Sequence, residues 1–231
     1  MSKKLLFLVL LNFLFFHGIT AQEKKDSLSL RFDFKFGNQP LELQKKYTTA
    51  SDTLEIDLMR FYLSDIQIAY EDASTFKEKN SYHLIDIEEL NSWVVGLDAY
   101  KNKKIKTVTF AIGIDSTASV SGALSGALDP SKGMYWAWQS GYINMKMEGK
   151  SNSCTTRNNR FQFHVGGYLQ PYCAWRKVEL HPKAAGTIVP IAVDLAELFS
   201  NVTLSKTNSI MIPGKRAVEM AELSTKMFQV E

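Results

Sequence analysis

The stretch SLRFDFKFG, residues 29–37, alternates apolar and polar side chains without interruption. Successive side chains of a β-strand point to opposite faces of the sheet, so the leucine and the three phenylalanines would share one face. The arginine, aspartate and lysine would occupy the other face and meet water. The stretch therefore predicts a half-buried strand that packs on a hydrophobic core.

The same period of two recurs along most of the chain, in short segments separated by turn residues such as Asp129-Pro130. Helical spacing is confined to DLAELF at 194–199 and GKRAVEMAELSTKMF at 214–228. Many short strands with little helix predict an all-β fold, an antiparallel β-sandwich of the immunoglobulin-like kind with one or two short helices. The further predicted strands are 59–70, 83–87, 106–114, 142–149, 160–167, 177–181 and 186–194.

Residues 1–21 have the pattern of a secretory signal peptide. Two lysines precede an apolar run from Leu5 to Phe16, and small residues end at Ala21. The run is shorter than the roughly 20 apolar residues of a membrane-spanning helix, and no second run follows it. We therefore expect cleavage near Ala21 and a single mature domain over residues 22–231, with no transmembrane segment. The location would be periplasmic or extracellular.

Charge and motifs narrow the classes of function. Two of the 27 lysines and arginines lie in the predicted leader, which leaves 25 basic residues against 24 acidic ones. A nearly neutral chain does not suggest nucleic acid as a partner. The sequence also lacks a GxSxG elbow, an HExxH motif and a glycine-rich phosphate loop, so we do not expect an enzyme. Asp115 and Asp129 lie in turn-rich sequence, where we expect them to cap turns.

Cys154 and Cys173 both lie in the predicted exported part. In an oxidising compartment an isolated pair is most simply a disulfide, and closing a loop of this length contributes on the order of 3 kcal/mol. The alternative is two thiolate ligands of a metal, although the paired CxxC spacing of such sites is absent. A disulfide would join the two ends of the segment that contains FQFHVGG, residues 161–167.

The stretch GMYWAWQSGY, residues 133–142, holds two of the four tryptophans. In a continuous strand over 133–149, Met134, Trp136 and Trp138 would share one face. Such a pair of indoles is either core packing, because aromatic side chains bury large areas, or an exposed platform. A platform would bind a sugar ring or border a metal pocket, and the spacing alone leaves both interpretations open.

Three histidines remain after the predicted leader. His164, in RFQFHVGG, falls on the face opposite Phe161 and Phe163 and is followed closely by two glycines, so it is free to reach a ligand. His83 alternates with isoleucines in HLIDI and fits a core position, whereas His181 precedes a proline and fits a solvated strand end. His164 is therefore the principal candidate for a metal ligand.

The segment GALSGALDPSKGMYWAWQSGYINMKMEG, residues 122–149, followed by FQFHVGGY, resembles the MbnP-like family of exported bacterial copper-binding proteins. The flanking segments agree, among them LRFDFKFGNQPLELQKKY, LMRFYLSDIQIAY, FAIGIDSTASVSGAL and IMIPGKRAVEMAE. The resemblance spans nearly the whole mature chain, and its central motif is long and specific. It implies a β-sandwich that binds copper outside the cytoplasm.

The resemblance also implies a modification and a partner. Family members are often paired with a di-haem peroxidase-like enzyme, and a tryptophan can be oxidised to kynurenine, which joins the copper site beside histidine. Indole offers only an N–H donor, whereas kynurenine has an aniline nitrogen and a ketone oxygen. Imidazole and thioether groups suit copper. The matching positions are Trp136 and Trp138 for the oxidised residue and His164 for the imidazole, with Met134 and His83 as secondary candidates.

Two functions of different classes follow from these observations. The leading one is an exported, non-catalytic copper-binding protein for metal acquisition or storage, with a tryptophan as the substrate of an oxidising partner. The alternative is a sandwich that binds carbohydrate or another small ligand on an aromatic platform. Its residues would be Trp136, Trp138, Tyr142, Asp129 and Asn144.

Overall fold

Two β-sheets share one hydrophobic core in the computed structural model, which describes residues 27–99, 103–138, 141–183 and 186–231. The expected signal peptide, residues 1–21, lies outside these ranges. Within the described part of the chain, no helix is both long and apolar enough to cross a membrane.

The smaller sheet is centred on β1 (Leu28–Phe36), in which every second side chain is buried, as the alternation predicted. β1 pairs in parallel with β13 (Ile188–Asp194), and β13 pairs antiparallel with β15 (Phe228–Val230). β2 (Gln39–Pro40) and β7 (Val94–Leu97) complete this sheet through antiparallel pairing with β1.

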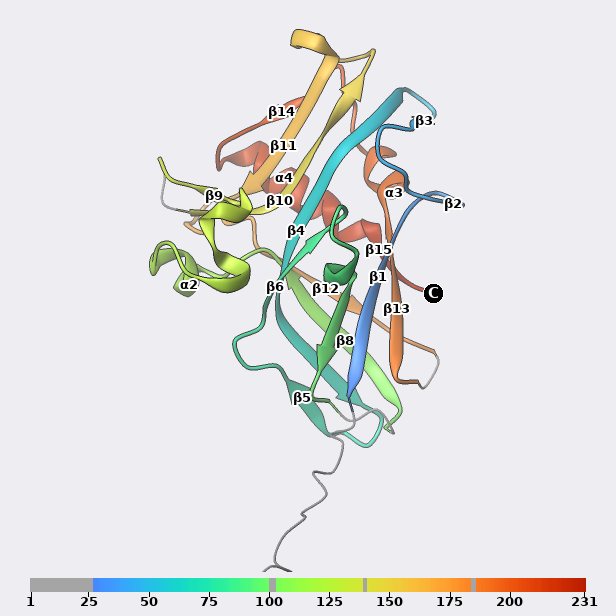
Figure 1. The fold of residues 1–231 in the computed structure, drawn as a ribbon, viewed down its shortest axis with the longest axis vertical. Coiled ribbons are helices and arrows are strands. Elements are labelled where there is room, and N and C mark those ends of the chain that lie inside the picture. Colours follow the sequence, from blue (N-terminus) through green and yellow to red (C-terminus); the bar gives the residue numbers. More distant parts are fainter. Residues whose placement is uncertain (1–26, 100–102, 139–140, 184–185) are drawn as a thin grey trace, which may run out of the picture.

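The larger sheet is organised by the long strand β4, which runs through much of the length of the molecule in Figure 1. Its strands are β3 (Lys46–Thr48), β4 (Thr53–Tyr70), β5 (Thr75–Lys77), β6 (Tyr82–Asp86), β8 (Ile105–Ile112), β9 (Tyr135–Trp136), β10 (Gly141–Ser151), β11 (Arg160–Gly166), β12 (Arg176–Leu180) and β14 (Ser209–Ile210). One edge of β4 pairs first with β10 and then with β8, while β3, β6 and β5 pair with the opposite edge. Beyond β10 lie β11 and then β14.

Short helices connect and cover the strands. The α-helices are α2 (Ser116–Val120), α3 (Leu195–Phe199) and α4 (Lys215–Ser224), and the 3-10 turns are η1 (Leu90–Trp93), η2 (Gly126–Leu128), η3 (Pro130–Lys132), η4 (Arg157–Asn159) and η5 (Thr225–Met227). α4 is amphipathic and buries Ala217, Met220 and Ala221 as it packs against β11. In Figure 1 α2 and β9 stand out from the side of the larger sheet.

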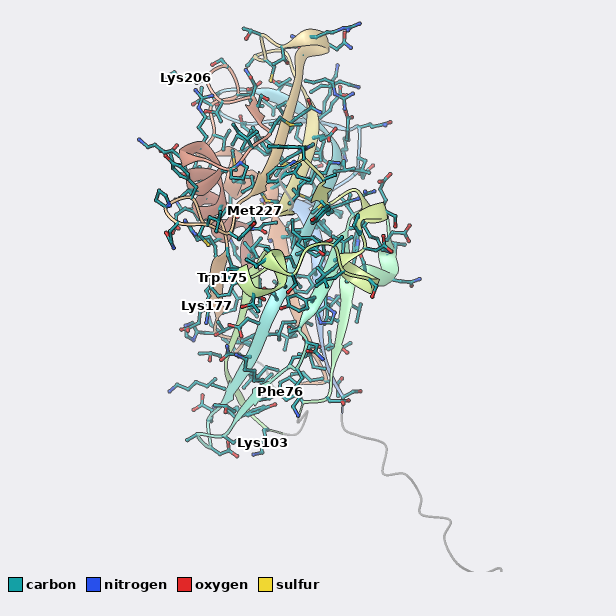
Figure 2. The ribbon with its side chains drawn as sticks, turned by 90° about the vertical axis from the view of Figure 1, so that its left-hand side faces the viewer. Phe76, Lys103, Trp175, Lys177, Lys206 and Met227 are labelled. Atoms are coloured by element: carbon teal, nitrogen blue, oxygen red, sulfur yellow. The ribbon has the colours of Figure 1, made fainter. Side chains whose placement is uncertain are left out.

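The core between the sheets is rich in phenylalanine. Phe32 of β1 contacts Phe61 and Phe110 of the larger sheet edge-on, with ring centroids 6.2 and 5.8 Å apart. Figure 2 places Met227 near the middle of the molecule, with Phe76 toward one end, and Met227 is fully buried. Burial of such large apolar side chains is the main stabilising contribution to a fold of this kind.

The predicted sandwich-like architecture is confirmed, and the structure corrects its details. Each segment predicted as a strand contains one, and both predicted helices form, as α3 and α4. A third α-helix, α2, is only five residues long and leaves no periodic pattern to detect. The sheets are mixed rather than wholly antiparallel, because β1–β13 and β11–β14 are parallel pairs joined by long crossovers instead of hairpins.

Candidate metal site

The motif GMYWAWQSGY folds back on itself instead of extending as one strand. η3 ends at Lys132 and is followed by Gly133, whose φ of +71° is the left-handed conformation that favours glycine. β9 then pairs antiparallel with the first residues of β10, with Trp136 opposite Gly141. A continuous strand over 133–149, the condition under which the two tryptophans would share a face, is therefore not formed, and Trp136 and Trp138 are not equivalent positions of one strand.

A second hydrophobic cluster, separate from the sandwich core, packs around this hairpin. Its members are Tyr62, Ile114, Ala118, Leu128, Met134, Trp136, Tyr142 and Ile143. The rings of Tyr62 and Tyr142 meet edge-on at a centroid distance of 5.9 Å. Their hydroxyls donate to the carbonyls of Ala127 and Leu128, each at 3.1 Å. These bonds fix the loop that precedes the hairpin.

The two tryptophans of the motif have opposite environments. Trp136 is 6% exposed and belongs to the second cluster, whereas Trp138 is 64% exposed in the turn after β9. Their ring centroids are 5.9 Å apart. A Cβ added at Gly166 would lie 2.7 Å from Cζ3 of Trp136, so this indole fills the space over the glycine. Because Gly166 and His164 share one face of β11, Trp136 lies one position along that face from His164.

His164 occupies the outer face of β11, and 9% of its side chain is exposed. Phe163 and Val165 on either side belong to the sandwich core, as the alternation predicted. Nε2 of His164 lies 2.8 Å from Oε1 of Glu148 on β10. An ionised carboxylate only accepts hydrogen bonds, so Nε2 donates to Glu148, and a neutral imidazole bound in this way keeps its lone pair on Nδ1.

Glu148 is engaged on several sides. The hydrogen bond from His164 lowers the pKa of Glu148; burial opposes this shift, and the charge of Lys146 adds to it. Lys146 Nζ lies 3.9 Å from Oε1, and Arg160 Nη2 lies 3.4 Å from Oε2. The carboxylate is therefore ionised at neutral pH and holds the imidazole in one orientation.

Two cations of the larger sheet tie the preceding loop to this outer face. Arg60 of β4 donates from Nη1 to the carbonyl of Lys132 at 3.2 Å, and Lys146 of β10 donates to the carbonyl of Gly133 at 3.3 Å. Arg60 and Lys146 are register partners on adjacent strands. Together they fix the point at which η3 ends and the hairpin begins.

The other described histidines lie away from His164. His83 of β6 is bound through Nε2 to both carboxylate oxygens of Glu78, at 2.9 and 3.0 Å. β6 and β11 are separated by β4 and β10, which makes three strand spacings of about 4.8 Å each. His181 is exposed and lies 3.5 Å from Glu179. The structure thus removes His83 as a secondary ligand of a site at His164.

The methionines singled out by the sequence motif serve packing. Met134 is fully buried in the second hydrophobic cluster. Met145 and Met147 are buried on the inner face of β10, in the sandwich core. Met134 is therefore corrected from a secondary ligand to a packing residue, since its thioether is enclosed by apolar side chains.

Cys154 and Cys173 are free, so the predicted disulfide is not formed. Cys154 lies between β10 and β11, and Cys173 lies after β11. The seven residues of β11 therefore separate them by on the order of 20 Å, whereas a disulfide needs Cα atoms within about 7 Å. Burial raises the pKa of the Cys154 thiol, and its sulfur lies 4.0 Å from the Leu204 carbonyl oxygen. A buried, protonated thiol also does not support the thiolate alternative.

The aromatic platform of the carbohydrate hypothesis is not formed. Tyr142 and Asn144 are each 2% exposed, and Trp136 is enclosed as well. Trp138 is left as a single exposed ring of that set. Asp129 caps η3, as predicted, by accepting a hydrogen bond from a backbone N–H.

The outer face of β11 offers an imidazole, a ligand type that suits copper, but few other donor groups lie near it. His164 and Glu148 form an imidazole–carboxylate pair, and outer-shell carboxylates commonly orient metal-bound histidines in this way. In the described ranges, no three or more histidine, cysteine, aspartate or glutamate residues gather as a metal cluster. A site at His164 would thus draw its remaining ligands from other chemical groups.

Sequence reasoning singled out His164 as a candidate ligand, and it did not single out Glu148 or Gly166 as its neighbours. Glu148 precedes His164 by 16 residues, and only the pairing register of β10 with β11 brings the carboxylate to the imidazole. The two glycines after the histidine were a usable signal, because a glycine inside a strand often marks a close approach by another group. Here that group is the indole of Trp136.

Comparison with known proteins agrees with this architecture. The fold is similar to a solved structure of MbnP from Methylosinus trichosporium, with a TM-score of 0.60 and 12% sequence identity over 81% of this chain and 82% of that chain. At this identity the likeness concerns the fold alone. No curated protein matches the chain. The family model of MbnP matches residues 25–212, which include the hairpin, β11 and β14, and the chain therefore belongs to the MbnP family.

Proposed function

We propose that this is an exported protein that binds copper at the outer face of β11, for acquisition or storage of the metal, with His164 as the imidazole ligand. The observation that carries the proposal is the 2.8 Å bond between His164 and Glu148, which leaves Nδ1 of the imidazole available to a metal. Membership of the MbnP family supports copper as the ion. Copper is then cargo, and the chain itself catalyses no reaction.

We further propose Trp138 as the tryptophan that a di-haem peroxidase-like partner oxidises to kynurenine. The Trp138 indole is 64% exposed and can meet an enzyme, whereas Trp136 is enclosed by the second cluster and Gly166. An indole N–H has no lone pair to offer a metal, but an aniline nitrogen and a ketone oxygen do. Kynurenine at this position would add donors close to a site that has one imidazole.

The proposal is tested by intact-mass and metal analysis of the mature protein purified from its native host. We expect bound copper, and a mass change that peptide mapping assigns to the peptide with Trp138. The peptides with Trp93 and Trp175 serve as internal controls, because both of these indoles donate hydrogen bonds within the fold.

The outcomes separate the two parts of the proposal. Copper with an unmodified Trp138 would remove the kynurenine and leave the imidazole site. A chain that carries no copper and takes up none on titration would contradict the proposed function as a whole.

A further inference from the structure

A cleft of about 500 Å³ opens on the smaller sheet, whereas the candidate metal site lies on the larger one. Residues 33–35 of β1 form its floor, and its two walls are the hairpin of residues 37–41 and the side chain of Trp93 in η1. In Figure 1, β2 and the C-terminus, which border the cleft, lie on the side of the molecule away from α2 and β9. The volume is within the range of roughly 300–1,000 Å³ found for small-molecule sites.

Contacts within the fold fix both walls of this cleft. The Trp93 ring packs against Phe34 at a centroid distance of 5.0 Å, and its indole N–H donates to the Asp86 carbonyl at 3.0 Å. In the opposite wall, the Leu41 N–H donates to the Phe34 carbonyl at 3.0 Å. A cleft whose walls are already in place loses little conformational entropy when a ligand binds.

The lining combines one aromatic surface with groups that form hydrogen bonds. Trp93 is only partly buried and lines the cleft together with the buried Leu41. Because the indole N–H is already bound, the ring offers a ligand an apolar surface. The side chains of Asn38 and Gln39 are exposed in the hairpin wall. An amide carries both donors and an acceptor, so each of them can bond a hydroxyl in either direction.

The charged residues of the cleft are paired with opposite charges. Lys35 Nζ lies 3.7 Å from Oε1 of Glu231, and Nε of Arg31 lies 2.8 Å from Oδ2 of Asp33. These pairs leave no excess charge that would attract an anion or a cation. The Asp33 carboxylate still has acceptor positions for a hydroxyl, because two oxygens offer about four lone pairs. The cleft therefore favours an uncharged ligand with hydroxyl groups.

We propose that this cleft binds a neutral sugar ring, one hexose unit of a glycan. The C–H face of the ring stacks on the Trp93 indole, and the hydroxyls at its edge bond the amides of Asn38 and Gln39. The site is distinct from the aromatic platform considered for residues 136–142. It goes beyond the proposed copper function and requires no metal.

The test is calorimetric titration of the mature protein with neutral oligosaccharides of glucose, galactose and mannose. Glucosamine and glucuronate serve as charged counterparts of the same ring. Trp93→Ala removes the aromatic wall, and Trp138→Ala is its matched control, an exposed tryptophan outside the cleft. Gln39→Ala changes an exposed side chain and decides the question if Trp93→Ala does not fold. Circular dichroism checks the fold of each variant.

We expect at least one neutral oligosaccharide to bind, about 10-fold or more weakly in Trp93→Ala, as for loss of an aromatic contact, and several-fold more weakly in Gln39→Ala. Trp138→Ala, His164→Ala and a copper chelator should leave the sugar affinity unchanged. The inference is overturned if none of the neutral sugars binds, if the charged rings bind in preference, or if Trp138→Ala weakens binding and Gln39→Ala does not. In each of these cases the proposed copper function still stands.

Discussion

Two histidine–glutamate pairs in the larger sheet have nearly the same internal geometry and very different surroundings. His164 meets Glu148 at 2.8 Å, and His83 meets Glu78 at 2.9 Å. The His164 side chain is 9% exposed, and its glutamate comes from the neighbouring strand. The His83 side chain is 29% exposed, and its glutamate precedes it by five residues.

We expect the surroundings of each pair to decide whether it binds a metal. Beside His164 lies the indole of Trp136, which fills the space over Gly166. Glu78 lines a surface depression together with Phe76, Lys77, Lys79, Gly96 and Asp98, and no further histidine is among them. A histidine hydrogen-bonded to a carboxylate is therefore not a metal site by itself. His164 differs from His83 in the burial of its side chain, 9% against 29% exposed, and in the Trp136 indole packed over Gly166 on the same strand.

The largest predicted difference between the two pairs is in copper affinity after each imidazole is removed. His164→Ala should weaken copper binding more than about 100-fold, because losing a ligand exceeds the 10- to 100-fold effect of outer-shell changes. His83→Ala should leave the affinity unchanged. Copper titration of the two variants, with circular dichroism as a folding control, checks this. Equal losses in both variants would mean that the two pairs do not differ as described.

The next effect concerns the close packing over β11. A Cβ at Gly166 would lie 2.6 Å from the Tyr142 carbonyl oxygen and 2.7 Å from the Trp136 ring, whereas one at Gly96 would have nothing within 4 Å. Gly96 lines the same depression as Glu78. Gly166→Ala should lower the free energy of unfolding by about 1–3 kcal/mol through overpacking, and Gly96→Ala should change it far less.

Denaturant unfolding of these two variants measures the difference. Equal stability of Gly166→Ala and Gly96→Ala would show that the hairpin yields easily, and that Trp136 is not held beside His164.

The smallest effect is a pH dependence that both pairs share. A hydrogen bond from His164 lowers the pKa of Glu148 below its usual 4.5. For Glu78, burial raises the pKa, but hydrogen bonds from His83 and Ser81 outweigh it and the net shift is downward. A carboxyl with a lowered pKa stabilises the fold above its unfolded-state pKa, and this contribution is lost as the pH falls through the folded-state value.

Unfolding measured between pH 7 and pH 3 should therefore show a shallower loss of stability in Glu148→Gln and in Glu78→Gln than in the unaltered chain. Each difference should be about 1 kcal/mol or less, as is usual for partly exposed pairs. Curves that run parallel to that of the unaltered chain would show that neither carboxylate is linked to folding.

The strand pattern was readable from the sequence because it depends on local alternation. The run over residues 29–37 became β1, and the faces of Phe163 and His164 were assigned correctly. The pairing of strands was not readable, since β14 reaches β11 through a long crossover. Glu148 was missed for the same reason, because only the pairing register of β10 with β11 brings it to His164.

Long-range geometry also explains the wrong expectations. The hairpin between Trp136 and Gly141 interrupts what reads as one alternating segment. The disulfide between Cys154 and Cys173 was inferred from compartment and number, but the intervening strand β11 holds the two residues apart. For both the tryptophans and the cysteines, the spacing in sequence gave no information about the distance in the folded protein.

The most direct test of the central claim is to follow the nitrogens of the three histidines in the mature domain by NMR while Cu(I), which is diamagnetic, is added. We predict that Nδ1 of His164 shifts on binding, that Nε2 keeps its proton through Glu148, and that His83 and His181 do not change. If His83 shifts in place of His164, or if the proton on Nε2 of His164 is displaced by the metal, the site described on the outer face of β11 is contradicted.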